Sequence, residues 1–477
     1  MSKNYDLVII GAGSGGLVVA SGAAGLGASV ALIEKHKMGG DCLNYGCVPS
    51  KAFLKPAHLA KDIDKASELG LSVGKVNVDV KEVMNYVRSV IKEIEPHDSR
   101  ERYEGLGVDV FEGSASLKDR HSVSVIDESN NETIIKGKKI VIATGAESAV
   151  PPIPGLKEID FLTNKSIFNL EKLPEHLIIL GGGPIGLELG QGFAHLGSKV
   201  TVIDMLPSLF PNDDPEVGPL MEKVLKEDGL SLKLSASINR LSEKDGQKTV
   251  LIKTKEGIEE EIVCDQVLVS LGRRPNSKGL NLEEVGIVVS KRGFIECNKS
   301  MQTSVSNIYA CGDIVGPYQF THMAGYQAGI ILRHSIFKMP AKVNYRTVPW
   351  VTYTRPEVAH VGLTEQMAKK DGLLEKVEKV DLKSIDRAKA DHDREGFLKF
   401  IIGKRNRLLG VTIVGQKAGE MIGIGALAIQ KELKASEFLS MVFPYPTQSE
   451  IYKFASLNLA KQGFKPWMKT LIKKIFL

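Results

Sequence analysis

Two cysteines stand close together near the start of the chain, in the segment Gly39–Lys51. Cys42 and Cys47 have four residues between them, and Gly46 lets the chain bend before the second thiol. Two thiols at this spacing could close a small disulfide, which takes up two electrons when it is reduced to the dithiol. Lys51 follows Cys47 by four residues, one helical turn, where its ammonium could lower the pKa of a thiol. The same pattern also suits two inert core cysteines, and the spacing alone leaves both interpretations open.

The cysteines directly follow a segment that predicts a strand, a glycine turn, a helix and a second strand over residues 5–33. The turn has the form G-x-G-x-x-G. Gly11 permits the tight turn, Gly13 lets the backbone approach a pyrophosphate, and Gly16 lets the helix pack on the strand. Glu34 ends the second strand, where a carboxylate can accept hydrogen bonds from ribose hydroxyls.

The same plan recurs over residues 177–203, with Gly181, Gly183 and Gly186 in the turn and Asp204 at the end of the second strand. In both repeats the acid stands 23 residues after the first glycine. Two matched units predict two bound dinucleotides, the alternative being two unliganded doubly wound domains. Because Asp204 would repel a 2′-phosphate, NADH is favoured over NADPH.

Later strands also end at residues suited to a ligand. Thr144-Gly145 and Gly272 end two apolar runs that we interpret as crossovers between domains. Asp313 follows the apolar run 308–311, where it could hold the sugar hydroxyls of a cofactor or simply cap a helix. From about Tyr345 shorter alternating strands mix with helix, which predicts a final α+β domain.

Composition narrows the class of protein. The 477 residues include 47 glycines, and the net charge is only +5, so nucleic-acid binding is not expected. Five cysteines, an odd and sparse number, suit a reducing compartment, and we expect a cytoplasmic protein. The N-terminus has no signal-peptide pattern, and no uncharged apolar run reaches the roughly 18 residues of a membrane span.

The cysteine segment, together with both glycine turns, Gly272-Arg273-x-Pro275-Asn276 and Gly312-Asp313, resembles the flavoprotein disulfide reductases, the class I pyridine nucleotide-disulfide oxidoreductases. Dihydrolipoyl dehydrogenase, glutathione reductase and mercuric reductase belong to this family. The resemblance covers almost the whole chain in order and spacing. It implies an α/β fold with two Rossmann-like domains and a C-terminal α+β dimerisation domain.

The resemblance also implies domain limits: FAD-binding 1–150 and 275–344, NAD-binding 151–274, and a homodimer-forming domain 345–477. Hydride would pass from the nicotinamide to the flavin, then to Cys47, while Cys42 exchanges with the acceptor. Residues expected to hold FAD are Gly11, Gly13, Gly16, Glu34, Lys51, Gly145, Asp313 and Ala324. Residues expected to hold the nicotinamide cofactor are Gly181, Gly183, Gly186, Glu188, Asp204 and Gly272.

The C-terminal part departs from the dithiol-using members of the family. Their His-Pro-Thr-x-Ser-Glu run supplies a base, whereas here Tyr445 stands at the position of the histidine, five residues before Glu450. A phenol with pKa near ~10 is a poor proton shuttle at neutral pH, so we expect weak lipoamide and glutathione-disulfide reduction. Mercuric reductase shares this tyrosine, but its C-terminal vicinal cysteine pair has no counterpart, since the last cysteine is Cys311. We expect no resident metal.

The sequence therefore leaves the electron acceptor open. It could be a small molecule, such as lipoamide or a quinone at a membrane surface, or a metal ion such as Hg(II). The protein could also be a redox sensor that has no acceptor. The tail 464–477 carries four lysines and apolar residues at helical spacing, so it could lie on the inner face of an anionic membrane or pack on its own protein. Two features are expected to be structural, namely His322 and the three cysteines Cys264, Cys297 and Cys311.

Overall fold

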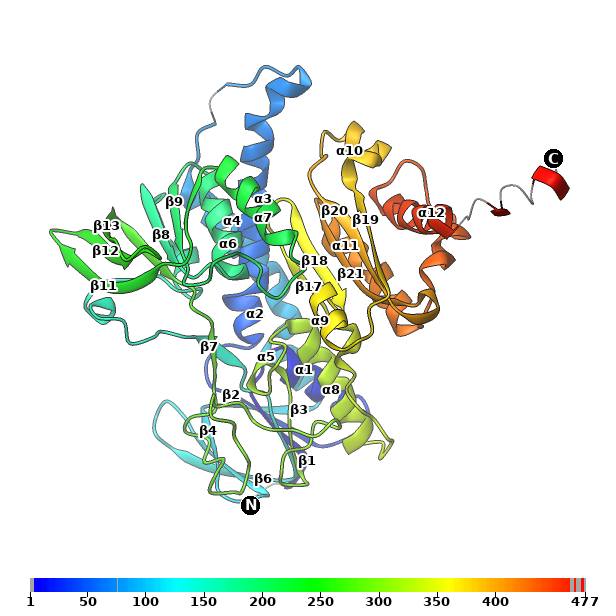
Figure 1. The fold of residues 1–477 in the computed structure, drawn as a ribbon. Coiled ribbons are helices and arrows are strands. Elements are labelled where there is room, and N and C mark those ends of the chain that lie inside the picture. The colour runs from blue at the N-terminus through cyan, green and yellow to red at the C-terminus, as the bar shows by residue number, and fades with distance from the viewer. Residues whose placement is uncertain (1–3, 75, 464–466, 469–472, 476–477) are drawn as a thin grey trace. The chain divides into compact units, whose positions relative to one another are not determined.

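A computed structural model describes residues 4–74, 76–463, 467–468 and 473–475, and the chain forms two compact units. Unit 1 comprises Met1–Gly181, Gly192–Ile203 and Ser237–Asn344, and unit 2 comprises Gly182–Gln191, Asp204–Ala236 and Tyr345–Leu477. Figure 1 labels many of the elements of both units. The three-domain division derived from the sequence stays a prediction.

A seven-stranded sheet forms the centre of unit 1, in the order β3-β2-β1-β6-β5-β4 with β16 on β6. The pairs among β3, β2, β1, β6 and β16 are parallel, whereas β4 and β5 join antiparallel. Val8 and Ile10 of β1 enter one apolar core, while Ile9 lies on the other face, against Gly16. Burial on both faces explains the unbroken apolar run. The strands are β1 (Asn4–Ile10), β2 (Val30–Glu34), β3 (Val108–Glu112), β4 (Ser114–Leu117), β5 (Ser122–Ile126), β6 (Glu132–Ile142) and β16 (Ile308–Ala310).

The helices of unit 1 include two packed pairs, α1 with α8 and α3 with α4. Pro49 occupies the first turn of α3, where a missing N–H is harmless. The sequence predicted a helical turn between Cys47 and Lys51, in agreement with α3, but it did not predict the hairpin of α3 with α4. The helices are α1 (Ser14–Ala24), α2 (Gly40–Asn44), α3 (Cys47–Asp64), α4 (Val80–Ile94), α5 (Arg100–Gly105) and α8 (Thr321–Ser335).

Unit 1 also contains the strands of the second glycine repeat. β8 (His176–Leu180) pairs in parallel with β9 (Lys199–Ile203) and β14 (Gln266–Val269). Helix α6 (Pro184–His195) begins at a proline, and its residues to Gln191 belong to unit 2. Unit 1 also has two small antiparallel sheets. One contains β11 (Ser237–Lys244), β12 (Gln247–Lys253) and β13 (Glu259–Cys264), and the other contains β7 (Ala146–Ser148) and β15 (Arg273–Pro275).

Unit 2 is built on a five-stranded antiparallel sheet in the order β17-β18-β21-β20-β19. This architecture confirms the predicted α+β domain. The strands are β17 (Pro349–Thr352), β18 (Glu357–Gly362), β19 (Lys376–Asp381), β20 (Phe397–Ile402) and β21 (Leu408–Gly415), with β10 (Leu230–Lys233) elsewhere in the unit. The helices are α7 (Val217–Glu227), α9 (Glu365–Lys370), α10 (Asp386–Ala390), α11 (Ala418–Gln430) and α12 (Ile451–Gly463).

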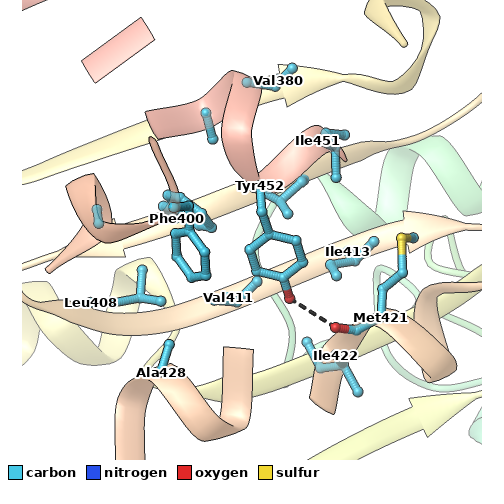
Figure 2. Packing of buried hydrophobic residues seen from close by; sticks show 14 of the residues in the cluster. Val380, Phe400, Leu408, Val411, Ile413, Met421, Ile422, Ala428, Ile451 and Tyr452 are labelled. Atoms are coloured by element: carbon cyan, nitrogen blue, oxygen red, sulfur yellow. Dashed lines mark hydrogen bonds between the residues drawn. The ribbon is translucent and has the colours of Figure 1, made fainter. Parts of the chain in front are cut away.

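Helices α11 and α12 cover one face of this sheet and share a core with it (Figure 2). Tyr452 of α12 is fully buried beside Phe400 of β20, with ring centroids 5.7 Å apart. Its hydroxyl donates to the Met421 carbonyl at 3.0 Å and accepts from the Gly425 N–H at 3.2 Å. Because both roles of the phenol are satisfied, the polar atom adds no desolvation penalty to the core.

Among the described residues, no helix combines the length and the apolar character needed to cross a membrane. Most of the basic tail 464–477 lies outside the described residues.

Candidate active site

The cysteine segment is held against the first glycine turn by backbone contacts. The Gly39 N–H donates to the Ala12 carbonyl at 2.9 Å. Gly40 has φ +60°, and a Cβ there would lie 2.7 Å from Gly13 Cα, so only glycine fits this approach. The two motifs, read separately from the sequence, are therefore one site in unit 1.

Cys42 lies in α2 and Cys47 is the first residue of α3. Cys42 is half-buried and Cys47 is exposed. The hydrogen bond with Cys47, then burial, raises the pKa of the Cys42 thiol, and a hydrogen bond with Thr321 opposes the rise. The two thiols thus lie close enough to interact, as the partners of a disulfide must.

Helix α8 begins at the thiols. Cys47 Sγ lies 3.4 Å from Thr321 Oγ1 in the first turn of α8, which contains no acidic residue. The partial positive charge of a helix N-terminus favours a thiolate. Lys51 is half-buried in the second turn of α3.

The first glycine turn has the shape that a dinucleotide requires. Gly11 has φ +103°, and Gly16 sits so close to Gly11 that a Cβ would lie 1.9 Å from its carbonyl oxygen. A Cβ on Gly13 would meet only Gly40 Cα, at 3.9 Å, and the first turn of α1 carries no acid. This open N-terminus suits a pyrophosphate. The Glu34 carboxylate accepts the Ala12 N–H at 2.7 Å and the His36 N–H at 2.8 Å, which fixes it beside the turn.

Three further residues expected at FAD lie in the same unit. Gly145 has φ +68° and open space around it. Asp313, three residues after the end of β16, is mostly buried, and burial raises the pKa of its carboxyl. A Cβ on Gly312 would lie 3.3 Å from Cβ of Ala324 in α8. The open helix N-terminus and the fixed acids fit FAD, so the residues present match the group that the resemblance implies.

In the second glycine turn, the part that belongs to unit 2 places an acid at the expected position. The Gly182 N–H and the Leu206 N–H donate to the two Asp204 carboxylate oxygens, at 2.6 and 2.7 Å. Gly183 has open space where a Cβ would point. The Asp204 carboxylate is thus held in place at the end of the turn.

The other residues expected at the nicotinamide cofactor are spread over both units. In unit 1, Gly181 has φ +106° and Gly272 has φ +100° with open space around it. In unit 2, Gly186 is buried in α6, and the buried Glu188 side chain accepts the Tyr353 N–H at 2.9 Å. The roles of these residues toward a cofactor stay predictions.

Tyr445 and Glu450 lie in unit 2. Tyr445 is 73% exposed, and its hydroxyl donates to the Asp386 carboxylate at 3.3 Å. Glu450 instead accepts the Thr447 N–H at 3.2 Å in a capping box, so its carboxylate is engaged with backbone. The charge of Asp386 raises the pKa of the Tyr445 phenol further above its ordinary value. The sequence did not predict the contact between Asp386 and Tyr445, because the two residues are 59 positions apart in the chain.

The structure brings together a partly buried polar cluster that the sequence patterns did not predict. Arg273 of β15 lies 3.0 Å from the Asp41 carboxylate and 3.2 Å from the Asp313 carboxylate. Asn164 also donates to Asp41, at 3.0 Å. Only the position of Asp41 directly before Cys42 could have drawn attention to it.

The remaining cysteines and His322 have ordinary surroundings. Burial raises the pKa of Cys264, Cys297 and Cys311 to about 12, so these groups stay protonated thiols. The His322 ring stacks on Phe320 with centroids 5.1 Å apart.

Comparison with known proteins agrees with this geometry. Residues 5–328 match the family described as pyridine nucleotide-disulphide oxidoreductase, and residues 348–456 match its dimerisation domain. Mercuric reductase from Staphylococcus aureus is 35% identical over 463 residues, covering 97% of this chain and 84% of that protein. Dihydrolipoyl dehydrogenase 3 from Pseudomonas putida is 37% identical over 469 residues, covering 96% and 98%.

Solved structures give the same assignment. The Cu(II) complex of RclA, an HOCl-induced flavoprotein disulfide reductase from Escherichia coli, has a TM-score of 0.86 at 29% identity, covering 96% of this chain and all of that one. LpdA from Mycobacterium tuberculosis has a TM-score of 0.87 at 25% identity, covering 95% and 99%. Enzymes of this family use FAD and take electrons from NAD(P)H. The chain therefore belongs to the pyridine nucleotide-disulphide oxidoreductase family.

Proposed function

We propose that the protein takes two electrons from NADH and passes them through a Cys42–Cys47 disulfide to a small acceptor or a metal ion. In the first half-reaction, NADH, a proton and the disulfide give NAD⁺ and the dithiol. In the second, the dithiol returns to the disulfide as two electrons reach the acceptor and two protons are released. FAD, when bound, accepts a hydride from NADH and gives two electrons to a disulfide.

The observation that carries this proposal is the interacting pair of thiols packed on the first glycine turn. Cys47, beside the N-terminus of α8, is the thiol we assign to the cofactor side. Cys42 is then the thiol that exchanges with the acceptor. Lys51 completes this group as a nearby cation, able to favour a thiolate or polarise a flavin.

The preference for NADH rests on Asp204. Its carboxylate is fixed by two backbone N–H groups, so it cannot move away from a 2′-phosphate without losing both hydrogen bonds. Residues 205–213 that follow it contain no lysine or arginine to neutralise such a phosphate.

The nature of the acceptor rests on Tyr445. A phenol that donates to Asp386 and has a raised pKa cannot serve as a base near neutral pH. Acceptors that need no proton shuttle, metal ions above all, are thereby favoured over lipoamide. A mercuric reductase and a Cu(II) complex among the similar proteins support the same choice.

An acceptor screen tests the proposal. NADH and NADPH are each offered to the purified flavoprotein with lipoamide, glutathione disulfide, Hg(II), Cu(II) and a soluble quinone. We expect turnover with NADH and a metal ion, and weak turnover with lipoamide. Replacing both Cys42 and Cys47 by serine should abolish it, whereas turnover that survives this change points to direct electron delivery from the flavin to a quinone. A wild-type protein inactive with every acceptor would support a redox sensor instead.

The assembly and location complete the proposal. The matched dimerisation domain supports a homodimer. We place it in the cytoplasm, with the basic tail as a candidate contact to an anionic membrane. Co-sedimentation with anionic liposomes, comparing the full chain with a chain ending at Gln462, tests that contact, and equal partitioning would dismiss it.

A further inference from the structure

Asp41, the residue before Cys42, fills the inside of the turn that joins the two cysteines. Its carbonyl oxygen accepts the Tyr45 N–H at 2.8 Å, which closes the turn. A Cβ on Gly46 would lie 3.0 Å from Asp41 O and 3.4 Å from Asp41 Oδ2. The carboxylate therefore lies against the backbone that leads into Cys47.

Both oxygens of this carboxylate are held by groups from distant parts of unit 1. Oδ1 accepts from Asn164 Nδ2 at 3.0 Å, and Oδ2 lies 3.0 Å from Arg273 Nη2. The Asn164 amide also donates to the Tyr45 carbonyl at 3.3 Å, at the other end of the turn. Asn164 is itself fixed, because its Oδ1 accepts from the Ser148 hydroxyl at 2.6 Å.

Arg273 anchors the group in the protein. Its Nη2 donates to the Ala146 carbonyl at 2.8 Å and lies 3.2 Å from Asp313, so it is held from three sides. The side chains of Arg273, Asp41 and Asp313 are 15%, 26% and 19% exposed. An ion pair this sheltered is screened less by water than a surface pair, and loss of one partner leaves an unpaired charge.

We propose that Asp41 is a positioning residue for the Cys42–Cys47 pair, held by Arg273 and Asn164 so that the turn keeps its two thiols within disulfide reach. This inference rests on the proposed function, in which the pair cycles between disulfide and dithiol. A turn held in the closed geometry gives the thiols a high effective concentration. Loosening it lowers the equilibrium constant for closing the disulfide.

The test measures that equilibrium constant. The FAD-loaded homodimer is equilibrated with glutathione buffers of graded redox potential, the free thiols are trapped with a maleimide, and the Cys42 and Cys47 peptides are quantified by mass. For Asp41→Ala we expect the constant to fall about tenfold, which is ~30 mV for a two-electron couple. The equilibrium constant for Asn164→Ala should also fall. Asp64→Asn, a change at an exposed acid at the end of α3, should leave the constant unchanged.

A double-variant cycle then tests the path of the effect. If Asp41 acts through Arg273, the double variant Asp41→Ala/Arg273→Met should lower the equilibrium constant for closing the disulfide little more than either single change does. If Asp41→Ala fails to fold, Asp41→Asn replaces it, since asparagine keeps the side-chain shape and one acceptor oxygen. This variant should still lower the equilibrium constant about threefold. Constants within twofold of wild type for Asp41→Asn and Asn164→Ala would overturn the inference. Failure of NADH to reduce the wild-type disulfide would contradict the proposed function alone, since these constants are measured without NADH.

Discussion

At the scale of single residues, we expect Asp204 to decide which nicotinamide cofactor is used. Two negative charges about 4 Å apart repel by roughly 4 kcal/mol at an effective dielectric constant of about 20. We predict that Asp204→Ala lowers kcat/KM for NADH about tenfold. The ratio of kcat/KM for NADH to kcat/KM for NADPH should also fall at least tenfold. Steady-state kinetics with both cofactors measure this, with Asp245→Asn in the β11–β12 hairpin as control. An unchanged NADH/NADPH ratio would contradict the assignment.

Tyr445 is a second residue whose chemistry depends on one neighbour. Because the charge of Asp386 raises the pKa of the phenol, Tyr445 should stay protonated at a pH where a free tyrosine already ionises. Asp386→Asn removes that charge and should move the pKa down toward ~10. The tyrosinate absorbance of each protein, minus that of its Tyr445→Phe counterpart, reports this titration. Glu450→Gln is the matched control and should shift it much less, since Glu450 is engaged with the Thr447 N–H.

At the scale of elements, one buried ammonium joins three segments of unit 2. Lys399 of β20 is fully buried and lies 3.5, 2.7 and 2.6 Å from the carboxylates of Asp214, Glu216 and Glu365. Lys399→Met would leave these acids without their shared cation, at a cost of about 3–5 kcal/mol in unfolding free energy. Thermal and urea unfolding measure it, with exposed Lys404→Met as control. Equal stability of the two variants would show that the acids find other partners.

A neighbouring acid predicts how stability changes with pH. Burial raises the pKa of Asp213 to about 6, although it accepts a hydrogen bond from Trp350 Nε1 at 2.9 Å. Since the unfolded carboxyl titrates near ~3.9, the folded state binds more protons between these values. Its stability contribution is therefore complete below about pH 4 and lost as the pH rises through about 6. The thermal unfolding midpoint of Asp213→Asn should therefore lie above that of wild type at pH 8. At pH 4 the difference between the two proteins should be much smaller.

At the scale of the whole molecule, the dimerisation domain leaves apolar side chains exposed on unit 2. Val442 is 90% exposed, and Met441 and Leu427 are 45% and 57% exposed. We expect a second copy to cover them, so Val442→Asp should shift the protein toward monomer. Light scattering at graded concentration measures the molar mass, with Val263→Asp on β13 as control. Two proteins of identical dimeric mass would place the interface elsewhere.

Much of the site could be predicted because its signals are local. Gly11 and Gly40 must be glycine, since their positive φ angles and close backbone approaches exclude a side chain. The acids Glu34 and Asp204 follow at a spacing set by one helix and two strands. The α3–α4 hairpin and the β11–β13 sheet were harder to predict. The hydrophobic pattern of a segment indicates its type of element, but not the distant element against which it packs.

The sequence by itself therefore determined the family and predicted the two cofactor sites and the redox pair, since each depends on residues that are neighbours along the chain. Only the tertiary structure decided what surrounds them. Asp41, Asn164, Arg273 and Asp313 come together from four separate segments, and Tyr445 meets Asp386 rather than Glu450. These contacts join residues that are far apart in the chain and depend on how whole elements pack, so a local sequence pattern does not predict them.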